Sequence, residues 1–384
     1  MKKGLFIILN IFSVLLEYFI IYLFFRILLH KNLIISLIMT IVILLIMALF
    51  VIYANVVLRK VSIEDKERPC EKELLELIRK VEEKYHKKFY LHYVSAPQPN
   101  PAWCIGRHIY INNEYRSDEV FLPGVIAHEL GHAISGISDY IFIPSIKLST
   151  TISRVLHLTI VAMYNAKKKW LNVSAKILFF PYYIINLNNI IFTYHFLRDD
   201  EIAANSIAVK LGYGEHLRSY YGFANYYGED PFLRKCDFFH PSISKMISIM
   251  NKDMKLKKEL LNIYSINNLL ILADIKTLTF TVPSHITEIG YNAIHNDNLI
   301  KISSKYVEKV HPNAFKNNKN LKAIYLENVK EFPVSCISRL DKLEIIKIND
   351  LKILEKIYHT YPNRKFSLSI YKVLVKNGII NEDE

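Results

Sequence analysis

VIAHELGHA, the stretch at residues 125–133, decides how the middle of the chain is organised. It places His-Glu-x-x-His among small and apolar residues, which predicts a helix. Residues four apart lie on one face of a helix, so His128 and His132 can present their imidazoles to a single zinc ion. Glu129 lies one step round the helix, where its carboxylate can take a proton from a zinc-bound water. A buried helix that carries these residues by chance is the alternative.

The composition predicts membrane segments. At 384 residues the chain has room for about two or three domains. Hydrophobic residues make up 51% and charged residues 22%, which is apolar for a soluble protein. The net charge of +13 accompanies no recognisable nucleic-acid module, so we expect contact with anionic membrane lipids and no nucleic-acid partner. The four cysteines form no C-x-x-C pair, which argues against a disulfide scaffold or a thiolate zinc site and fits a reducing compartment.

Two apolar runs at the amino terminus predict a transmembrane helical hairpin. Residues 4–25 contain one charge, Glu17, and residues 32–58 contain none. Each run is long enough to cross a hydrocarbon core of about 30 Å. The first run is too long for a signal peptide and leads almost directly into the second. Lysines and arginines flank the outer ends of the hairpin more than its turn, so the positive-inside rule predicts that the catalytic and repeat domains lie on the cytoplasmic side. We expect the membrane to be a bacterial-type plasma membrane.

The segments before the motif predict a helix and two strands. Residues 71–87 show the spacing of an amphipathic helix, and residues 89–94 and 108–112 read as short strands. Ser117 or Pro123 can start the motif helix, because serine caps well and proline suits the first turn.

A third zinc ligand is expected downstream, because catalytic zinc usually has three protein ligands and one open position. The segment RDDEIAANSIA, residues 198–208, has helical periodicity and small alanines that permit close helix packing. Glu201 is its strongest candidate ligand. Asp199 and Asp200 are interpreted as a solvated helix start.

Several elements, in order over roughly residues 60–250, resemble the membrane-embedded zinc peptidases of the HtpX and CAAX-prenyl-protease family. Ala102, Trp103 and Gly106 match a segment that in this family leads into an edge strand and then into a His-Glu-Leu-Gly-His helix. Pro101 stands where that family has an asparagine. The resemblance implies that the following strand lies beside the cleft and pairs with an extended peptide substrate. The strand residues concerned are His108, Ile109, Tyr110 and Ile111.

The same resemblance implies roles for residues further along. Glu201 takes the ligand position of a Glu-x-x-Ala-Asp helix, and Asn205 replaces the aspartate that orients a zinc-bound imidazole. An amide accepts the imidazole N–H without adding charge, so we expect weaker zinc binding rather than loss of activity. His240 matches a His-Pro element and can donate a hydrogen bond to the oxyanion; a structural histidine is the alternative. Met246 stands where the family has an arginine.

The apolar stretch between the two motif segments, residues 143–196, predicts a membrane-associated insertion. Residues 171–196 are long enough for a span, but Lys176 and the central Pro181 weaken that interpretation. An interfacial or re-entrant pair of helices is an equal alternative to true spans. In both cases the chain returns to the side from which it left, as a shared zinc site requires.

From residue 258 onward the sequence repeats with a period of 21 or 22. Leucines at 299, 321 and 343 are each followed three residues later by isoleucine, and Asn-Ala pairs recur at 292 and 313. The pattern resembles the BspA-like type of leucine-rich repeat and predicts a solenoid. Its function would be to dock a protein partner; a stabilising appendage is the alternative. One further series with this period is Ile289, Val310, Phe332 and Leu354.

Together these observations predict an α+β, mainly helical chain. Its parts are a transmembrane hairpin (1–60), a gluzincin-type zinc peptidase domain (61–257, with the insertion 143–196) and a leucine-rich-repeat domain (258–384). The resemblance implies a membrane-anchored zinc metalloendopeptidase with one Zn²⁺ per chain, acting on membrane or misfolded proteins. A catalytically weak or inactive scaffold or sensor, which binds partners through its repeats, is the alternative.

Overall fold

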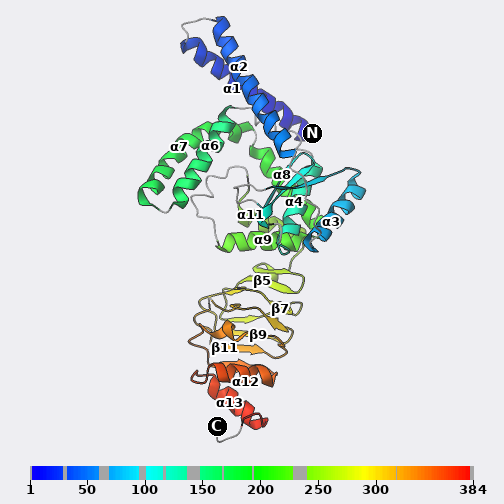
Figure 1. Cartoon of the computed structure of the whole chain (residues 1–384), viewed down its shortest axis with the longest axis vertical. Helices are drawn as coiled ribbons and strands as arrows, with labels where there is room; N and C mark the ends of the chain where they lie inside the picture. The colour runs from blue at the N-terminus through cyan, green and yellow to red at the C-terminus, as the bar shows by residue number, and fades with distance from the viewer. Residues whose placement is uncertain are drawn as a thin grey trace. The chain divides into compact units, whose positions relative to one another are not determined.

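The computed structural model describes residues 2–28, 33–59, 69–94, 101–115, 118–135, 148–166, 168–192, 194–227, 240–316 and 318–380. The chain is α+β and mainly helical, with small sheets, as predicted. It divides into two compact units, residues 1–214 with 229–249 and residues 215–228 with 250–384 (Figure 1). The domain boundaries given above stay a prediction.

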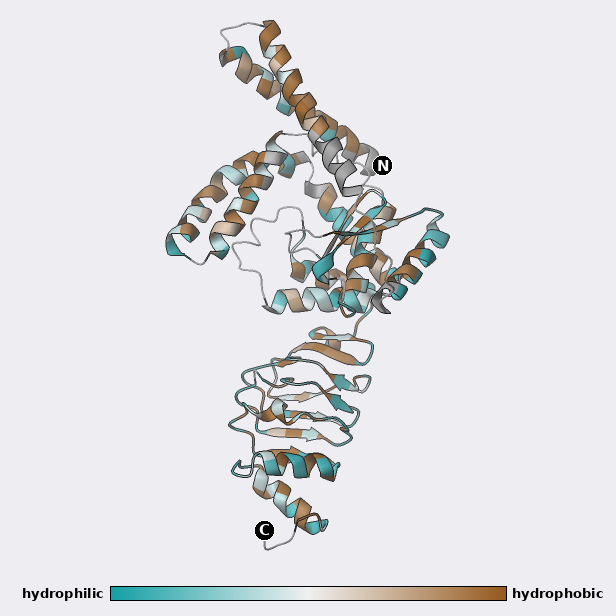
Figure 2. Cartoon of the chain, in the orientation of Figure 1, coloured by the Kyte–Doolittle hydropathy of each residue, from teal (hydrophilic) through white to brown (hydrophobic). Residues whose placement is uncertain are grey.

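The first unit begins with two long apolar helices, α1 (Lys2–Leu28) and α2 (Leu33–Arg59), which pack against each other. Figure 2 shows that both helices are mainly hydrophobic. Most of their large hydrophobic side chains, where burial is described, are exposed. Among the described residues, only Ile7–Ile27 is long and apolar enough to cross a membrane, and Leu33–Leu49 forms a shorter apolar helix. A signal sequence near an amino terminus can meet the same criterion of length and hydropathy, so the transmembrane hairpin stays a prediction.

A second helical pair, α6 (Leu148–Asn165) and α7 (Lys169–Phe192), lies within the predicted insertion. The two helices are antiparallel and share a small core, and α7 continues through Pro181. Their outer faces expose large apolar side chains, for example Phe180 at 69%. The pair is tied to α1 at its first turn, where the buried Glu17 carboxylate accepts hydrogen bonds from the Ser149 N–H at 2.8 Å and from its hydroxyl at 2.5 Å.

A three-stranded sheet lies next to the motif helix α4 (Leu122–Ser135). β1 (Tyr90–Val94) pairs in parallel with β3 (His108–Asn112), and β2 (Ala102–Ile105) pairs with β3 antiparallel on its other side. β2 turns into β3 at Gly106, whose φ of +61° is a left-handed conformation that glycine adopts without strain. An amphipathic helix, α3 (Pro69–Tyr85), precedes the sheet. The predicted helix and both predicted strands are confirmed, with small shifts at their ends.

The order of the strands corrects the predicted substrate strand. His108, Ile109, Tyr110 and Ile111 lie in the central strand, whose backbone is already paired with β1 on one side and with β2 on the other. An extended peptide therefore has no edge to pair with at these residues. Alternation of apolar and polar residues predicts that a segment is a strand, but it carries no information about the strand's place in a sheet. The segment before Gly106, interpreted as a lead-in, is itself an edge strand, and α4 packs against it more than against β3.

The second unit is built from short strands in two sheets, and within each sheet the main row of neighbouring strands follows the order of the sequence (Figure 1). Phe280, Ile302, Ile324 and Ile346, each 22 positions apart, are neighbours on the parallel strands β6, β9, β11 and β12. Their side chains all point into one core. The elements are α9 (Gly214–Tyr227), the end of α11 (Ile243–Asp253), β4 (Ile263–Ile266), β5 (Leu269–Asp274), β6 (Thr279–Thr281), β7 (Glu288–Ile289), β8 (Ile294–His295), β9 (Lys301–Ser304), β10 (Lys309–Val310), β11 (Ala323–Leu326), β12 (Ile345–Lys347), α12 (Leu351–Thr360) and α13 (Ser367–Lys376).

The repeated asparagines occupy equivalent backbone positions. Asn292 and Asn313 have φ of +48° and +58°, a left-handed conformation that asparagine tolerates better than most residues. The other repeated series, Ile289, Val310, Phe332 and Leu354, does not end in a strand. Its last member, Leu354, lies in the helix α12. It is nevertheless buried on the same core, together with residues of α13, so the two helices close the carboxyl-terminal end of this unit.

Arg218 explains why α9 belongs to the second unit rather than to the first. Its buried guanidinium donates hydrogen bonds to Asn251 Oδ1 and to the backbone carbonyls of residues 260, 261 and 263, at 2.5 to 3.0 Å. The guanidinium also lies 4.4 Å from the centre of the Tyr264 ring. A Cβ at Gly222 would meet the same ring at 2.4 Å, so α9 packs closely on the start of β4.

Candidate metal centre

Asp118 holds the turn that leads into the motif helix α4. Its carboxylate accepts hydrogen bonds from the backbone N–H groups of Val120 at 3.0 Å and Phe121 at 2.9 Å, just before the helix begins at Leu122. Pro123 lies in the first turn, as predicted, whereas Ser117 lies outside the described residues. From Leu122 to Ala133 all but one of the residues of α4 are buried, so the two histidines are presented inside the unit rather than on its surface.

Close packing of two helices brings the third ligand to the motif. α4 crosses α8 (Tyr194–Lys210) at Gly131, where an added Cβ would lie 2.6 Å from Ala204 Cα and 2.8 Å from its carbonyl oxygen. Ala204 and Ala208 are fully buried on this face, as their small size permits. The predicted close packing of the alanine-rich helix is confirmed for these two residues.

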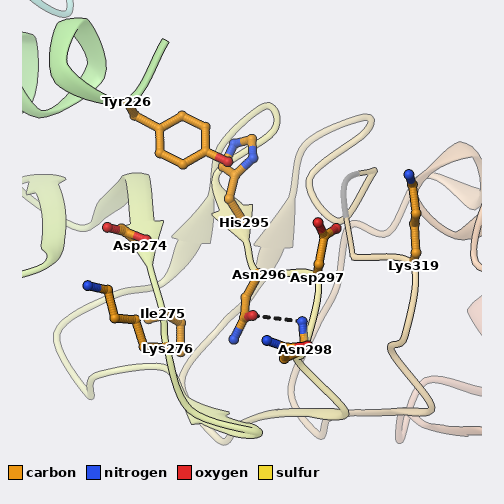
Figure 3. Close-up of a pocket in the computed structure, with 9 residues that line it drawn as sticks. All are labelled: Tyr226, Asp274, Ile275, Lys276, His295, Asn296, Asp297, Asn298 and Lys319. Carbon is orange, nitrogen blue, oxygen red and sulfur yellow. Dashed lines mark hydrogen bonds between the residues drawn. The ribbon is translucent and has the colours of Figure 1, made fainter. Parts of the chain in front are cut away.

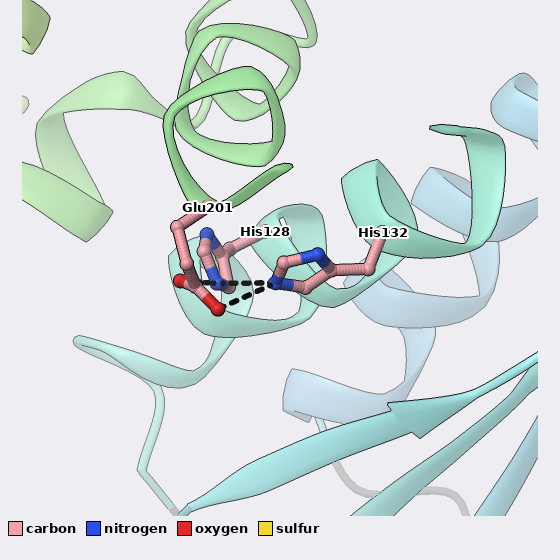
Figure 4. Close-up of side chains that lie close together, drawn as sticks. All are labelled: His128, His132 and Glu201. Carbon is pink, nitrogen blue, oxygen red and sulfur yellow. Dashed lines mark hydrogen bonds and ion pairs between the residues drawn. The ribbon is translucent and has the colours of Figure 1, made fainter. Parts of the chain in front are cut away.

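Three side chains converge at this crossing (Figure 4). His128 Nε2 lies 3.1 Å from His132 Nε2 and 3.3 Å from Glu201 Oε2, and His132 Nε2 lies 3.3 Å from Glu201 Oε1. All three ligand atoms lie within 4.8 Å of one another. Ligand atoms about 2.1 Å from a tetrahedral zinc are spaced by about 3.4 Å, so this set fits a zinc ion without rearrangement. The structure thus brings together the three predicted ligands.

The other nitrogen of each imidazole is held by a different residue of α8. His128 Nδ1 lies 2.8 Å from Asn205 Oδ1, and His132 Nδ1 lies 2.7 Å from Asp200 Oδ2. Because both acceptors call for a proton on Nδ1, the Nε2 lone pairs are left to face the metal position. Asn205 is therefore in a position to orient the imidazole of His128.

The contact of Asp200 was missed in the sequence. Its side chain was interpreted as part of a solvated helix start, but it is buried, with 6% exposed, and faces His132. The missed signal is the helical spacing: Asp200, Ala204 and Ala208 are four residues apart, so Asp200 lies on the face that packs against α4. Small residues at the second and third of these positions mark that face as buried.

Burial and charge act in opposite directions on the titratable groups of the site. Burial raises the pKa of Glu129, and the neighbouring histidines offset only part of this effect. Burial also raises the pKa of Glu201, but His132 and His128 more than reverse it and hold that pKa well below its usual range. Burial lowers the pKa of His132, whereas Glu201 and Asp200 raise it well above the ordinary value. The pKa values of Glu129 and Glu201, which lie on facing helices, are thus shifted in opposite directions.

His240 also reaches the site, just before α11. Its Nε2 lies 3.4 Å from Glu201 Oε1, and its side chain is 48% exposed. The contact places a half-exposed imidazole beside the carboxylate of the cluster. Met246, in place of the arginine expected from the resemblance, is buried in α11.

The central strand contributes packing rather than ligands. Tyr110 stacks between His92 and Trp103, with ring centroids 4.9 and 5.6 Å away, and His108 accepts or donates a 2.8 Å hydrogen bond with His92. Ile109 and Ile111 are fully buried on the other face of the strand.

A polar cavity of about 660 Å³ lies within the second unit (Figure 3). The imidazole of His295 is buried there at 4.4 Å from the Tyr226 ring, and burial lowers its pKa. Asp274 and Asp297 line the cavity together with Lys276 and Lys319, so positive and negative charges are mixed. Within the described residues, only the cluster of the first unit has the donor set and spacing of a metal site.

Comparison with known proteins adds no relative. No protein-family model, curated protein or solved structure matches the chain. The two imidazoles and the carboxylate of the site lie close enough together to hold a metal ion.

Proposed function

We propose that this chain is a zinc-dependent metalloendopeptidase anchored in a membrane. The observation that supports it most is the meeting of His128, His132 and Glu201 from two helices, with the Nδ1 atom of each histidine already held by an acceptor. Of the three ligands, Glu201 is separated from the motif by the whole α6–α7 insertion. A chance His-Glu-x-x-His sequence gives no reason for a distant carboxylate to complete the set.

The residues of the chain divide the work of peptide hydrolysis. Zinc bound by the three ligands would polarise the scissile carbonyl and acidify the attacking water. Glu129 accepts a proton from that water and passes it to the leaving amine; its raised pKa brings the carboxylate closer to neutrality, where a general base works best. His240, half-exposed at the edge of the cluster, donates a hydrogen bond to the oxyanion of the carbonyl.

The fold proposed around this site is of the gluzincin type, with β2 as the strand that holds the substrate. β2 is an edge strand of the three-stranded sheet, and α4 packs against it. An extended peptide that added to its outer edge would be held through backbone hydrogen bonds, which tolerate many side chains. This tolerance suits a protease that acts on misfolded or membrane proteins.

The membrane part of the proposal comprises both helical pairs. α1 and α2 form the transmembrane hairpin of residues 1–60, with both ends in the cytoplasm. The α6–α7 pair, within the insertion 143–196, exposes apolar side chains along its length and carries Lys168, Lys169 and Trp170 at its tip, a mixture suited to the lipid interface.

The second unit is proposed to be a leucine-rich-repeat solenoid that docks a protein partner. Strand neighbours 22 residues apart and one continuous core support this reading. A stabilising appendage without a ligand is the alternative, and the mixed charges of its cavity do not decide between them.

The decisive experiment compares full-length wild type with Glu129→Gln, each purified in detergent. We expect one zinc per chain in both proteins. Casein cleavage by wild type should exceed that of the variant by at least about 10²-fold, because the variant has lost its general base. Equal cleavage by the two proteins would disprove the proposal. Zinc in both with cleavage by neither would instead favour the scaffold or sensor, for which the uncharged Asn205 acceptor is the supporting observation.

A further inference from the structure

The two zinc-binding imidazoles differ in what holds them. The His132 N–H is held by a carboxylate, Asp200, at 2.7 Å, and the His128 N–H is held by an amide, Asn205, at 2.8 Å. We propose that Asp200 is the main positioning residue of the site and supplies the charge that strengthens its hold on zinc. Asn205 only orients its partner. The inference rests on the proposed function and names the residue of this chain on which metal binding depends most.

The position of Asp200 excludes a role in starting the helix. α8 begins at Tyr194, so Asp200 lies beyond the first turn, where every backbone N–H has a partner inside the helix. The carboxylate is 6% exposed, and its Oδ1 has no hydrogen-bond partner within the described residues. Burying a carboxylate with one oxygen that accepts no hydrogen bond costs free energy. An amide could make a purely structural contact at a lower cost in free energy.

The charge of Asp200 has a use that an amide cannot replace. A carboxylate that accepts the imidazole N–H makes the opposite nitrogen a stronger donor to a cation, whereas an amide fixes only the orientation of the ring. The carboxylate also adds negative charge close to a divalent ion in a buried site, where charges are poorly screened. We expect its loss to weaken the hold on the metal through both effects.

The amide at position 205 fits the same account. When ionised, Glu129, Asp200 and Glu201 already place three negative charges around an ion that carries two positive ones. A fourth carboxylate at position 205 would add repulsion in a site that excludes most water. One charged and one neutral acceptor therefore orient both rings while limiting the excess negative charge.

The test measures zinc affinity of the full-length protein in detergent by competition with a chromophoric chelator. Asp200→Asn should bind zinc about 10- to 100-fold more weakly than wild type, the usual effect of losing an outer partner of a ligand. Asp199→Asn is the matched control: it removes the same type of charge one residue away, and its zinc affinity should stay within about threefold, because the 2.7 Å hydrogen bond with His132 belongs to Asp200. The double exchange Asp200→Asn with Asn205→Asp should recover most of the loss, since it returns a carboxylate to the other imidazole.

Two further readouts separate this role from a structural one. The visible absorption of the cobalt(II)-loaded proteins should keep its tetrahedral character in the double exchange and weaken in Asp200→Asn. Asn205→Ala, which leaves Asp200 intact, should lose less than about tenfold in zinc affinity. That variant tests the proposal even if Asp200→Asn does not fold.

Three results would overturn the inference while leaving the proposed function in place. They are wild-type affinity in Asp200→Asn, a larger loss in Asn205→Ala than in Asp200→Asn, and a double exchange that binds no better than Asp200→Asn alone. Absence of stoichiometric zinc from the wild-type protein would overturn both the inference and the proposed function.

Discussion

Glu129 and Glu201 are carboxylates on facing helices with little exposure to solvent, yet their pKa values move in opposite directions. Glu201 lies within 3.4 Å of three imidazoles, whose charges and hydrogen bonds favour its ionised form. Glu129 is affected mainly by burial, which favours its protonated form. Two carboxyl groups whose environments separate them in this way are suited to two tasks, one as a ligand and the other as a base.

Zinc affinity should still depend on pH at values above the pH range in which an ordinary histidine titrates. Glu201 and Asp200 raise the pKa of His132 well above its usual value in the metal-free protein, so a proton competes with the metal for that imidazole. Below this raised pKa, the apparent zinc affinity should fall by about tenfold per pH unit, since one proton is displaced. Chelator competition between pH 6 and 9 measures the slope. An affinity that does not change over this interval would contradict the prediction.

The same groups give the metal-free protein a pH window of stability. Because the pKa of His132 is raised on folding, its contribution is complete below the ordinary imidazole pKa and is lost as pH rises through the folded value. Because the pKa of Glu201 is lowered, its contribution is complete above the ordinary carboxyl pKa and is lost as pH falls through the folded value. Both contributions are present between these limits.

The three candidate metal ligands could be predicted from the sequence, but not all of the residues that hydrogen-bond to them. His128, His132 and Glu201 could be predicted because metal binding restricts both residue types and spacing. Asn205 was predicted because of the resemblance. Asp200 was not, because an aspartate in a polar run, close to a helix start, normally faces water. Only the packing of α8 against α4 buries it.

Among the helices and strands, the crossing of α4 and α8 sets the geometry of the site. Gly131→Ala would place a methyl group 2.6 Å from a backbone atom of Ala204, so the helices must separate. Overpacking of this kind costs typically about 1–3 kcal/mol, and the displaced Glu201 should reduce zinc affinity by at least about tenfold. Zinc competition and thermal unfolding measure the two effects. Ala203→Ser, on the exposed side of α8, is the control and should change neither.

Arg218 fixes α9 to the second unit through a set of hydrogen bonds that no other side chain could reproduce. In Arg218→Lys the planar fork is lost and at least two buried carbonyl groups lose their donor. We expect the free energy of unfolding of this unit to fall by about 3 kcal/mol. Denaturant unfolding measures the change. Arg364→Lys, which changes an ion pair with the exposed Asp341 and a single hydrogen bond to the Ser338 carbonyl, should cost only about 1 kcal/mol. Equal losses in the two variants would contradict this account.

The strands show what periodicity does and does not reveal. The 22-residue spacing appears as the pairing of Phe280, Ile302, Ile324 and Ile346, because a regular period in sequence places equivalent residues side by side. Leu354 keeps the phase of the pattern but lies in a helix, since the pattern records burial and not the element that provides it. The central position of β3 could not be predicted, because it requires β2 as a neighbour. The segment that forms β2 was interpreted as a lead-in to the strand.

For the whole molecule, the orientation in the membrane is open to direct measurement. If α1 and α2 form a hairpin with both ends in the cytoplasm, residues after 60 lie on that side. Protease added to sealed inside-out vesicles should then remove the carboxyl-terminal repeats, and protease added to right-side-out vesicles should leave them intact. The opposite pattern would reverse the orientation predicted from the flanking charges.

The hydrogen bonds of Glu17 with Ser149 impose an order on how this chain is made. If α1 enters the bilayer as proposed, its carboxylate does so 132 residues before the ribosome has supplied its donors. At a synthesis rate of about 5–20 residues per second, that interval is on the order of ten seconds. During this time the Glu17 carboxylate lies in lipid without its Ser149 donors, which is costly. The newly inserted hairpin therefore lacks these hydrogen bonds and is accessible to quality control until α6 arrives.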